Sequence, residues 1–138
     1  NLQNITLEQR QAIDPTVIAS FFTTAIGQRL LNAKSVQRET PFSYGLYAGE
    51  IYPQAVGSQA QEMILIQGVV DCLFEEDNRL VLLDFKTDAT TGLSLNELKG
   101  RYQLQIMLYV RAVEQIWKRP VTEKYLYFFD GAHLVNMD

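Results

Sequence analysis

Two long apolar segments, separated by a short polar turn, constrain the fold of this chain more than any other feature. Residues 63–74 (MILIQGVVDCLF) and 79–87 (RLVLLDFKT) are rich in branched and aromatic side chains. Both are apolar on two faces, which is typical of central strands in a sheet covered on both sides. Residues 75–78 (EEDN) separate them. The sequence therefore predicts a central β-hairpin with other elements packed against both of its faces.

Helical periodicity flanks this hairpin. Asp14 and Pro15 indicate a helix start, because Asp caps the first turn and Pro fits its first position. The apolar stripe that follows predicts one helix to about residue 33. A second long helix is predicted over residues 95–119, where a proline directly follows. A short helix is expected around residues 7–13.

The remaining strands are shorter. Residues 35–42 alternate as a strand that Pro41 ends, and residues 43–60, rich in Gly, Tyr, Pro and Gln, suggest a long hairpin or surface loop. A further strand is predicted over residues 124–129, with 132–137 as its hairpin partner. This order of elements predicts an α/β domain with a mixed sheet flanked by helices.

Composition limits the function. The 138 residues amount to one domain, and 12 basic against 16 acidic side chains give a net charge of −4. This balance excludes a protein that holds nucleic acid by bulk positive charge alone. The one cysteine, Cys72, excludes an intrachain disulfide and a cysteine-rich metal site. No apolar run has the length of a membrane helix, and no signal peptide is visible. Because the chain starts at Asn1 without Met, we expect a fragment of a longer protein.

The hairpin brings two acids together. If Asp77 and Asn78 form a two-residue turn, Asp71 lies opposite Asp84 and their Cβ atoms are roughly 4.5–5.5 Å apart. Two carboxylates held this closely among apolar neighbours repel each other and need a proton or a cation. Mg²⁺, which prefers oxygen ligands, would fit this site. A bulge in either strand would separate the pair.

Lys86 extends this candidate site, because strand alternation places it on the same face as Asp84. A lysine beside a metal-bound carboxylate pair can orient a water or stabilise a developing negative charge. This set is what metal-assisted phosphodiester hydrolysis requires. In the alternative interpretation, Lys86 pairs with Asp84 or Asp88 at a strand end, and Asp71 is a solvated edge residue.

The second long helix offers Tyr102, Gln105 and Tyr109, which lie within an arc of roughly 60°. A glutamine between two tyrosines on the buried side predicts a polar contact with the metal site or with phosphate. The alternative is that Gln105 flanks the apolar stripe and that both tyrosines are core aromatics with exposed hydroxyls.

Taken in order, three motifs make the sequence resemble the RecB-family nucleases of the PD-(D/E)xK, restriction-endonuclease-like superfamily. They are Gln67-Gly68-Val69-Val70-Asp71, Asp84-Phe85-Lys86-Thr87 and Tyr102-x-x-Gln105-x-x-x-Tyr109. The short Asp-x-Lys element alone is a weak signal, whereas the ordered set is much stronger. Residues 38–42, 65–71 and 125–129 are similar to the AddA/RexA-type helicase–nuclease subgroup. The resemblance covers nearly the whole chain from about residue 35 and implies a restriction-endonuclease-like core.

The resemblance also implies roles for individual residues. Asp71 and Asp84 would ligate the catalytic metal together with the backbone carbonyl of Phe85, and Lys86 would be the catalytic lysine. The pair Gln105 and Tyr109 would lie near the active site. Glu39 matches an acidic position of the family less securely. Two interpretations of Glu39 have equal weight: it is a metal ligand, or it is a surface glutamate beside Pro41.

One departure concerns histidine. Family members carry a metal-binding histidine on a helix upstream of the first strand, whereas the one histidine here, His133, is near the C-terminus, where a surface hairpin residue is expected. We therefore expect residues 1–138 to be a single nuclease domain fragment without that helix or the upstream helicase. Such a fragment would bind metal weakly and cut DNA poorly or not at all when isolated.

The expected function is that of a Mg²⁺-dependent (or Mn²⁺-dependent) DNA exonuclease domain of a bacterial helicase–nuclease that processes double-strand breaks for recombinational repair. The expected partners are DNA, the helicase domains of the same chain and an AddB/RexB-type protein, in the cytoplasm and away from membranes. An iron–sulfur cluster is not expected, and ATP would bind only in the helicase part, because no P-loop is present. The alternatives are a catalytically silent docking or scaffold module and another RecB-like exonuclease.

Overall fold

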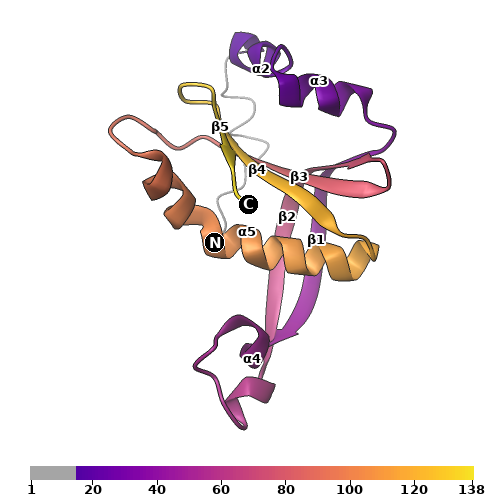
Figure 1. The fold of residues 1–138 in the computed structure, drawn as a ribbon, viewed down its shortest axis with the longest axis vertical. Coiled ribbons are helices and arrows are strands. Elements are labelled where there is room, and N and C mark those ends of the chain that lie inside the picture. Colours follow the sequence, from indigo (N-terminus) through magenta and orange to yellow (C-terminus); the bar gives the residue numbers. More distant parts are fainter. Residues whose placement is uncertain (1–14) are drawn as a thin grey trace.

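The computed structural model describes residues 15–138. It contains one five-stranded sheet whose strands follow one another in chain order (Figure 1). Strands β3 and β4 are parallel, and the other neighbouring pairs are antiparallel. The predicted mixed α/β architecture is therefore confirmed. The strands are β1 (Val36–Tyr47), β2 (Met63–Glu76), β3 (Arg79–Lys86), β4 (Val121–Phe128) and β5 (His133–Asn136).

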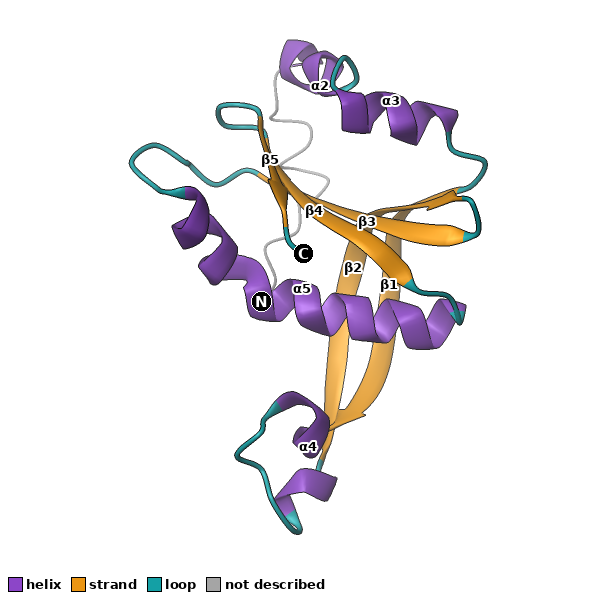
Figure 2. Cartoon of the chain, in the orientation of Figure 1, coloured by secondary structure: helices purple, strands orange, loops and turns teal. Residues whose placement is uncertain are grey.

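Helices cover both faces of the central hairpin, as the apolar segments predict. Helix α5 (Leu95–Trp117) crosses one face, whereas α2 (Pro15–Phe21) and α3 (Ala25–Asn32) belong to a second core on the other (Figure 2). Two short elements, α4 (Ala48–Ile51) and the 3₁₀ helix η1 (Gln59–Gln61), lie between β1 and β2. No helix in the described range 15–138 is long and apolar enough to span a bilayer.

The prediction of one helix up to residue 33 is wrong, because the chain breaks it between Phe21 and Ala25. Thr24 caps α3, and its hydroxyl accepts the N–H of Gly27 at 3.1 Å. A Cβ on Gly27 would lie 2.3 Å from the carbonyl oxygen of Phe21, so the corner requires glycine. The apolar stripe runs through both helices, and periodicity alone does not reveal the break. Asp14 and the predicted helix at 7–13 lie outside the described residues.

The prediction that Pro41 ends the first strand is also wrong. Strand β1 continues through Pro41 to Tyr47, so part of the region expected to be a loop is strand. Proline is tolerated because β1 is an edge strand and pairs only with β2. Beyond the pair of Phe42 and Gly68, which contacts Tyr109 of α5, strands β1 and β2 continue as an arm (residues 43–67) that carries α4 and η1 at its end (Figure 1).

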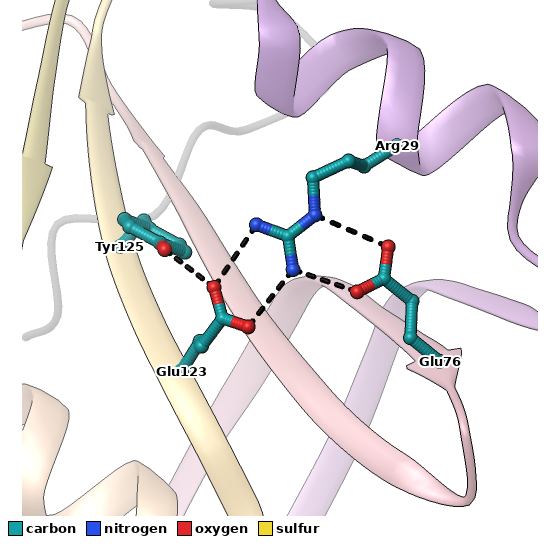
Figure 3. Close-up of polar contacts among 4 residues, drawn as sticks. All are labelled: Arg29, Glu76, Glu123 and Tyr125. Atoms are coloured by element: carbon teal, nitrogen blue, oxygen red, sulfur yellow. Dashed lines mark hydrogen bonds and ion pairs between the residues drawn. The ribbon is translucent and has the colours of Figure 1, made fainter.

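An ionic contact that sequence analysis did not identify ties α3 to the sheet. The guanidinium of Arg29 binds Glu76 at 2.7 and 3.1 Å and Glu123 at 2.9 Å twice (Figure 3). Tyr125 donates its hydroxyl to Glu123 at 2.5 Å. These hydrogen bonds, first the one that Arg29 donates to Glu76, raise the pKa of Arg29 further above its ordinary value. One arginine thus connects α3 with the end of β2 and with β4.

Candidate active site

The hairpin between β2 and β3 has the predicted register. Asp77 and Asn78 have φ angles of 49° and 64°, so both residues of the turn are left-handed, as a type I′ turn requires. The strands pair from Glu76 with Arg79 up to Cys72 with Leu83. The regular ladder ends at this pair; Asp71 and Asp84 are the next residues of the two strands, and their carboxyl groups lie next to each other. The predicted neighbourhood of the two aspartates is confirmed.

The alternation of side chains between the two faces of the sheet is interrupted in β2 near Asp71. Val70 and Leu73 both pack into the core under α5, although they are three residues apart. Cys72 and Phe74 pack into the other core, beneath α2 and α3. Regular alternation would place residues 70 and 73 on opposite faces, so the alternation is interrupted between them. This local irregularity lies at the candidate site.

The interruption turns the Asp71 side chain toward the neighbouring strand. Its Oδ2 accepts the backbone N–H of Phe85 at 2.9 Å. On the other side, the β1–β2 register places Glu39 opposite Asp71, and Glu39 has a positive φ of 47°. Asp71 therefore reaches into the space between β2 and β3, where the two strands separate.

Asp71 and Asp84 are buried, with 3% and 1% of their surface exposed. The prediction of a solvated Asp71 at a strand edge is therefore wrong. The Oδ1 atom of each has no hydrogen-bond partner among the described residues. Burial, followed by the adjacent Asp84 carboxyl, raises the pKa of Asp71 well above its ordinary value. A divalent cation fits this pair, because it would bind the two unpartnered oxygens and offset their repulsion.

Lys86 completes the cluster from the α5 side of the sheet. Its ammonium is fully buried and lies 2.9 Å from Asp84 Oδ2. It also donates to Gln105 Oε1 at 3.0 Å, and it lies 4.4 Å from the centre of the Tyr102 ring. The ion pair between Lys86 and Asp84 that the alternative interpretation expected is therefore present. It is buried, however, whereas ion pairs at strand ends are usually solvated.

Gln105 occupies the position that the functional interpretation predicts. It is buried on α5, and its side-chain oxygen contacts the lysine of the cluster. Its Nε2 has no hydrogen-bond partner among the described residues. The interpretation in which Gln105 merely flanks the apolar stripe is wrong. The helix therefore contributes a polar group directly to the candidate site.

Tyr109 lies one turn further along α5, at the base of the arm. Its ring meets Phe42 edge-on at 5.0 Å between centroids. A Cβ on Gly68 would lie 2.5 Å from its hydroxyl oxygen, so the glycine of the Gln67–Asp71 motif makes room for this tyrosine. The structure gathers Asp71, Asp84, Lys86 and Gln105, and places Tyr109 beside that group.

Two other candidates stay outside the cluster. Glu39 is exposed, and residues 15–138 contain no group of three or more His, Cys, Asp or Glu side chains placed to hold a metal. His133 is exposed on β5, where it pairs with Phe128, as predicted for a surface hairpin residue. Within the described part of the chain, the buried acidic side chains that are candidates for holding a metal are therefore Asp71 and Asp84.

Comparison with known proteins identifies the family to which the chain belongs. Residues 8–136 match the PD-(D/E)XK nuclease superfamily, whose members generally use divalent metals. The chain is 43% identical to an ATP-dependent helicase/nuclease subunit of Geobacillus kaustophilus over 97% of its length, and 46% identical to the corresponding subunit of Bacillus licheniformis over 95%. It spans only 11% of each relative.

A solved structure has a related fold. The crystal structure of SSO0001 superimposes with a TM-score of 0.50 over 96% of this chain and 56% of that chain, at 15% identity. This likeness concerns the fold alone. The family match extends over nearly the whole sequence and includes the hairpin with Asp71 and Asp84. The chain is therefore a nuclease domain that belongs to the PD-(D/E)XK superfamily.

Proposed function

We propose that this domain is the Mg²⁺-dependent DNA exonuclease of a bacterial helicase–nuclease that processes double-strand breaks for recombinational repair. The observation that carries the proposal is the buried group of Asp71, Asp84, Lys86 and Gln105. Two buried carboxylates with unpartnered oxygens are costly to a fold unless a proton or a cation offsets their charge, and the metal of a nuclease is such a cation. The names of the relatives, which are helicase/nuclease subunits, support a longer chain with ATP-dependent motor domains.

In this proposal each residue has a defined part. Asp71 and Asp84, with the Phe85 carbonyl, hold the metal, and these hard oxygen donors suit Mg²⁺ and also Mn²⁺. The bound metal would lower the pKa of a water molecule and neutralise charge on the phosphate. Lys86 orients the attacking water and stabilises negative charge on the phosphate oxygens. Gln105 holds the lysine ammonium in place from α5.

A second candidate function is a catalytically silent nuclease-fold module that serves as a scaffold. The observation that favours it is the lack, among residues 15–138, of a third acidic or histidine side chain at the pair. Two carboxylates and a carbonyl hold a divalent ion more weakly than a complete ligand set does. The two candidates differ in whether the folded domain cleaves DNA when metal is supplied.

The arm supports the part of the proposal that concerns partner proteins. Residues 39–78 contain no lysine or arginine, so the arm offers no side-chain cation to a phosphate backbone. Tyr47 pairs with Met63, and Gly45 pairs with Leu65, which places these residues on one face. The three large side chains are 51–59% exposed. Such a face suits protein contact with the helicase part of the same chain or with an AddB/RexB-type protein.

A direct test compares the full-length chain with its Asp84→Ala variant on linear and circular single-stranded DNA, in Mg²⁺ and in Mn²⁺. We expect Mg²⁺ to support cleavage of linear DNA and Asp84→Ala to remove it, because one metal-binding carboxylate is lost. Glu62→Ala, which removes an exposed acid directly before β2, is the matched control and should cleave normally. Equal activity of the wild type and Asp84→Ala would refute the proposal, and a folded wild type that is inactive in both metals would favour the scaffold.

The proposed location is the cytoplasm, because the relatives are bacterial proteins and bacterial chromosomal DNA lies there. Detection of the full-length chain in the cytoplasmic fraction of fractionated cells would support this part of the proposal.

A further inference from the structure

The ammonium of Lys86 is enclosed by groups from two elements. Asp84 on the same strand and Gln105 on α5 lie within hydrogen-bonding distance of it. The face of the Tyr102 ring, 4.4 Å away, forms a further wall. A cation is attracted to the negative face of an aromatic ring, and this attraction is strongest where water is excluded. Lys86 is fully buried, so Tyr102 contributes to holding its charge as well as to packing.

The Tyr102 ring is itself held at its far end. Its hydroxyl donates a hydrogen bond to Asp88, which follows Lys86 by two residues in the loop after β3. Arg101 Nη1 lies 3.8 Å from the same Asp88 oxygen. The body of the ring also packs against Phe128 of β4, with 5.9 Å between centroids. The ring is therefore fixed in position by α5, the loop and β4.

The loop that carries Asp88 is also anchored. Thr90 donates its backbone N–H to the carboxylate of Asp130 at 2.8 Å, and its hydroxyl lies 3.1 Å from the same oxygen. Asp130 belongs to the turn between β4 and β5. The hydrogen bonds from Thr90, first that of its backbone, lower the pKa of Asp130 and keep the acceptor ionised. Asp88 is thus a fixed acceptor for the tyrosine hydroxyl.

We propose that Tyr102 is a positioning residue for Lys86: the face of its ring holds the ammonium toward Asp84, while Asp88 keeps the ring in this orientation. This inference rests on the proposed nuclease function. It adds a residue outside the candidate set of Asp71, Asp84, Lys86, Gln105 and Tyr109. The contribution of Tyr102 is to the placement of the lysine, and Tyr102 does not itself bind DNA or metal.

The test uses the full-length chain and two substitutions of Tyr102. Tyr102→Phe keeps the ring face and loses the hydroxyl, whereas Tyr102→Leu keeps an apolar side chain and loses the ring. We expect Tyr102→Leu to lower kcat about tenfold with little change in KM for single-stranded DNA, because the ammonium loses its aromatic wall. Tyr102→Phe should lower kcat by less than Tyr102→Leu, because the ring face remains and only the hydrogen bond to Asp88 that orients it is lost. A purely structural role would instead make kcat follow thermal stability.

Phe74→Leu is the matched control, because it removes a fully buried ring from the other core, beneath α3. It should lower the melting temperature without lowering kcat at temperatures where the chain is folded. An unchanged kcat in Tyr102→Leu would overturn the inference, as would a loss in Tyr102→Phe equal to that in Tyr102→Leu.

The proposed function itself is tested separately by Lys86→Ala. If Lys86→Ala cleaves DNA normally, the nuclease mechanism is wrong, whereas an inactive Lys86→Ala with a normal Tyr102→Leu refutes only the role of Tyr102.

Discussion

Replacing Gly68 by alanine tests whether the close contact between β2 and α5 sets the position of the helix over the site. A Cβ at this position would lie 2.5, 2.8 and 2.9 Å from three atoms of the Tyr109 side chain. All three distances are shorter than a van der Waals contact, and Tyr109 is 1% exposed and packed against Phe42. The ring therefore cannot move aside without displacing other core residues.

Overpacking of this kind costs about 1–3 kcal/mol of unfolding free energy. For a domain of this size the cost corresponds to a fall in melting temperature of roughly 3–10 °C. Urea denaturation of the wild type and Gly68→Ala measures it directly, provided that both unfold in one transition. Tyr109→Phe should recover part of the loss in the double variant, because it removes the atom nearest to the new methyl group.

Gly100→Ala provides the matched control for Gly68→Ala. Gly100 lies inside α5, and a Cβ there would have no atom within 4 Å. Alanine is favoured over glycine in a helix interior by about 0.5–1 kcal/mol, so Gly100→Ala should be stabilising. The reasoning is refuted if Gly68→Ala unfolds at the same urea concentration as the wild type, or if both alanine variants shift stability in the same direction.

Three further outcomes are expected. Burial and Asp84 raise the pKa of Asp71, so the metal-free folded state keeps a proton on Asp71 that the unfolded state releases. The free energy of unfolding of the metal-free domain should therefore fall as the pH rises from about 4 through neutrality, by up to about 1.4 kcal/mol per pH unit. Asp71→Asn should flatten this slope in urea titrations at several pH values, and a slope unchanged by the substitution would contradict the assignment. Arg29→Lys should lower the unfolding free energy by about 1 kcal/mol or less, because the ion pairs of Arg29 with Glu76 and Glu123 are partly exposed and screened by water. An unchanged urea midpoint would show that these ion pairs add nothing to stability. Gln105→Leu should reduce metal-dependent cleavage about tenfold by removing the acceptor for Lys86, and undiminished cleavage would rule out that role.

The parts of the fold that were predictable from sequence are those that local rules decide. The β2–β3 register follows from a two-residue turn and a period of two, and both can be counted along the chain. Helix α5 was also predictable, because Ser94 and Glu97 form a capping box and an apolar stripe follows. These elements were predicted to within two or three residues of their observed bounds.

The errors arose where a neighbouring element decides the outcome. Whether Pro41 ends a strand depends on whether that strand has a second neighbour, and β1 has only one. The break before α3 depends on how closely Gly27 approaches Phe21 once the corner has formed. The Arg29 cluster joins residues 47 and 94 positions apart, and no short-range pattern indicates such a contact.

The sequence by itself determined that Asp71 and Asp84 meet and that Lys86 shares a face with Asp84, since the register of a tight hairpin is a local property. Only the tertiary structure decided what surrounds them. The interrupted alternation at Asp71 turns its carboxylate between the strands, and the packing of α5 brings Gln105 and Tyr102 to the ammonium. The physical reason is that the rotation of a helix over a sheet is set by the packing of its whole face, here including Tyr109 in the space that Gly68 leaves.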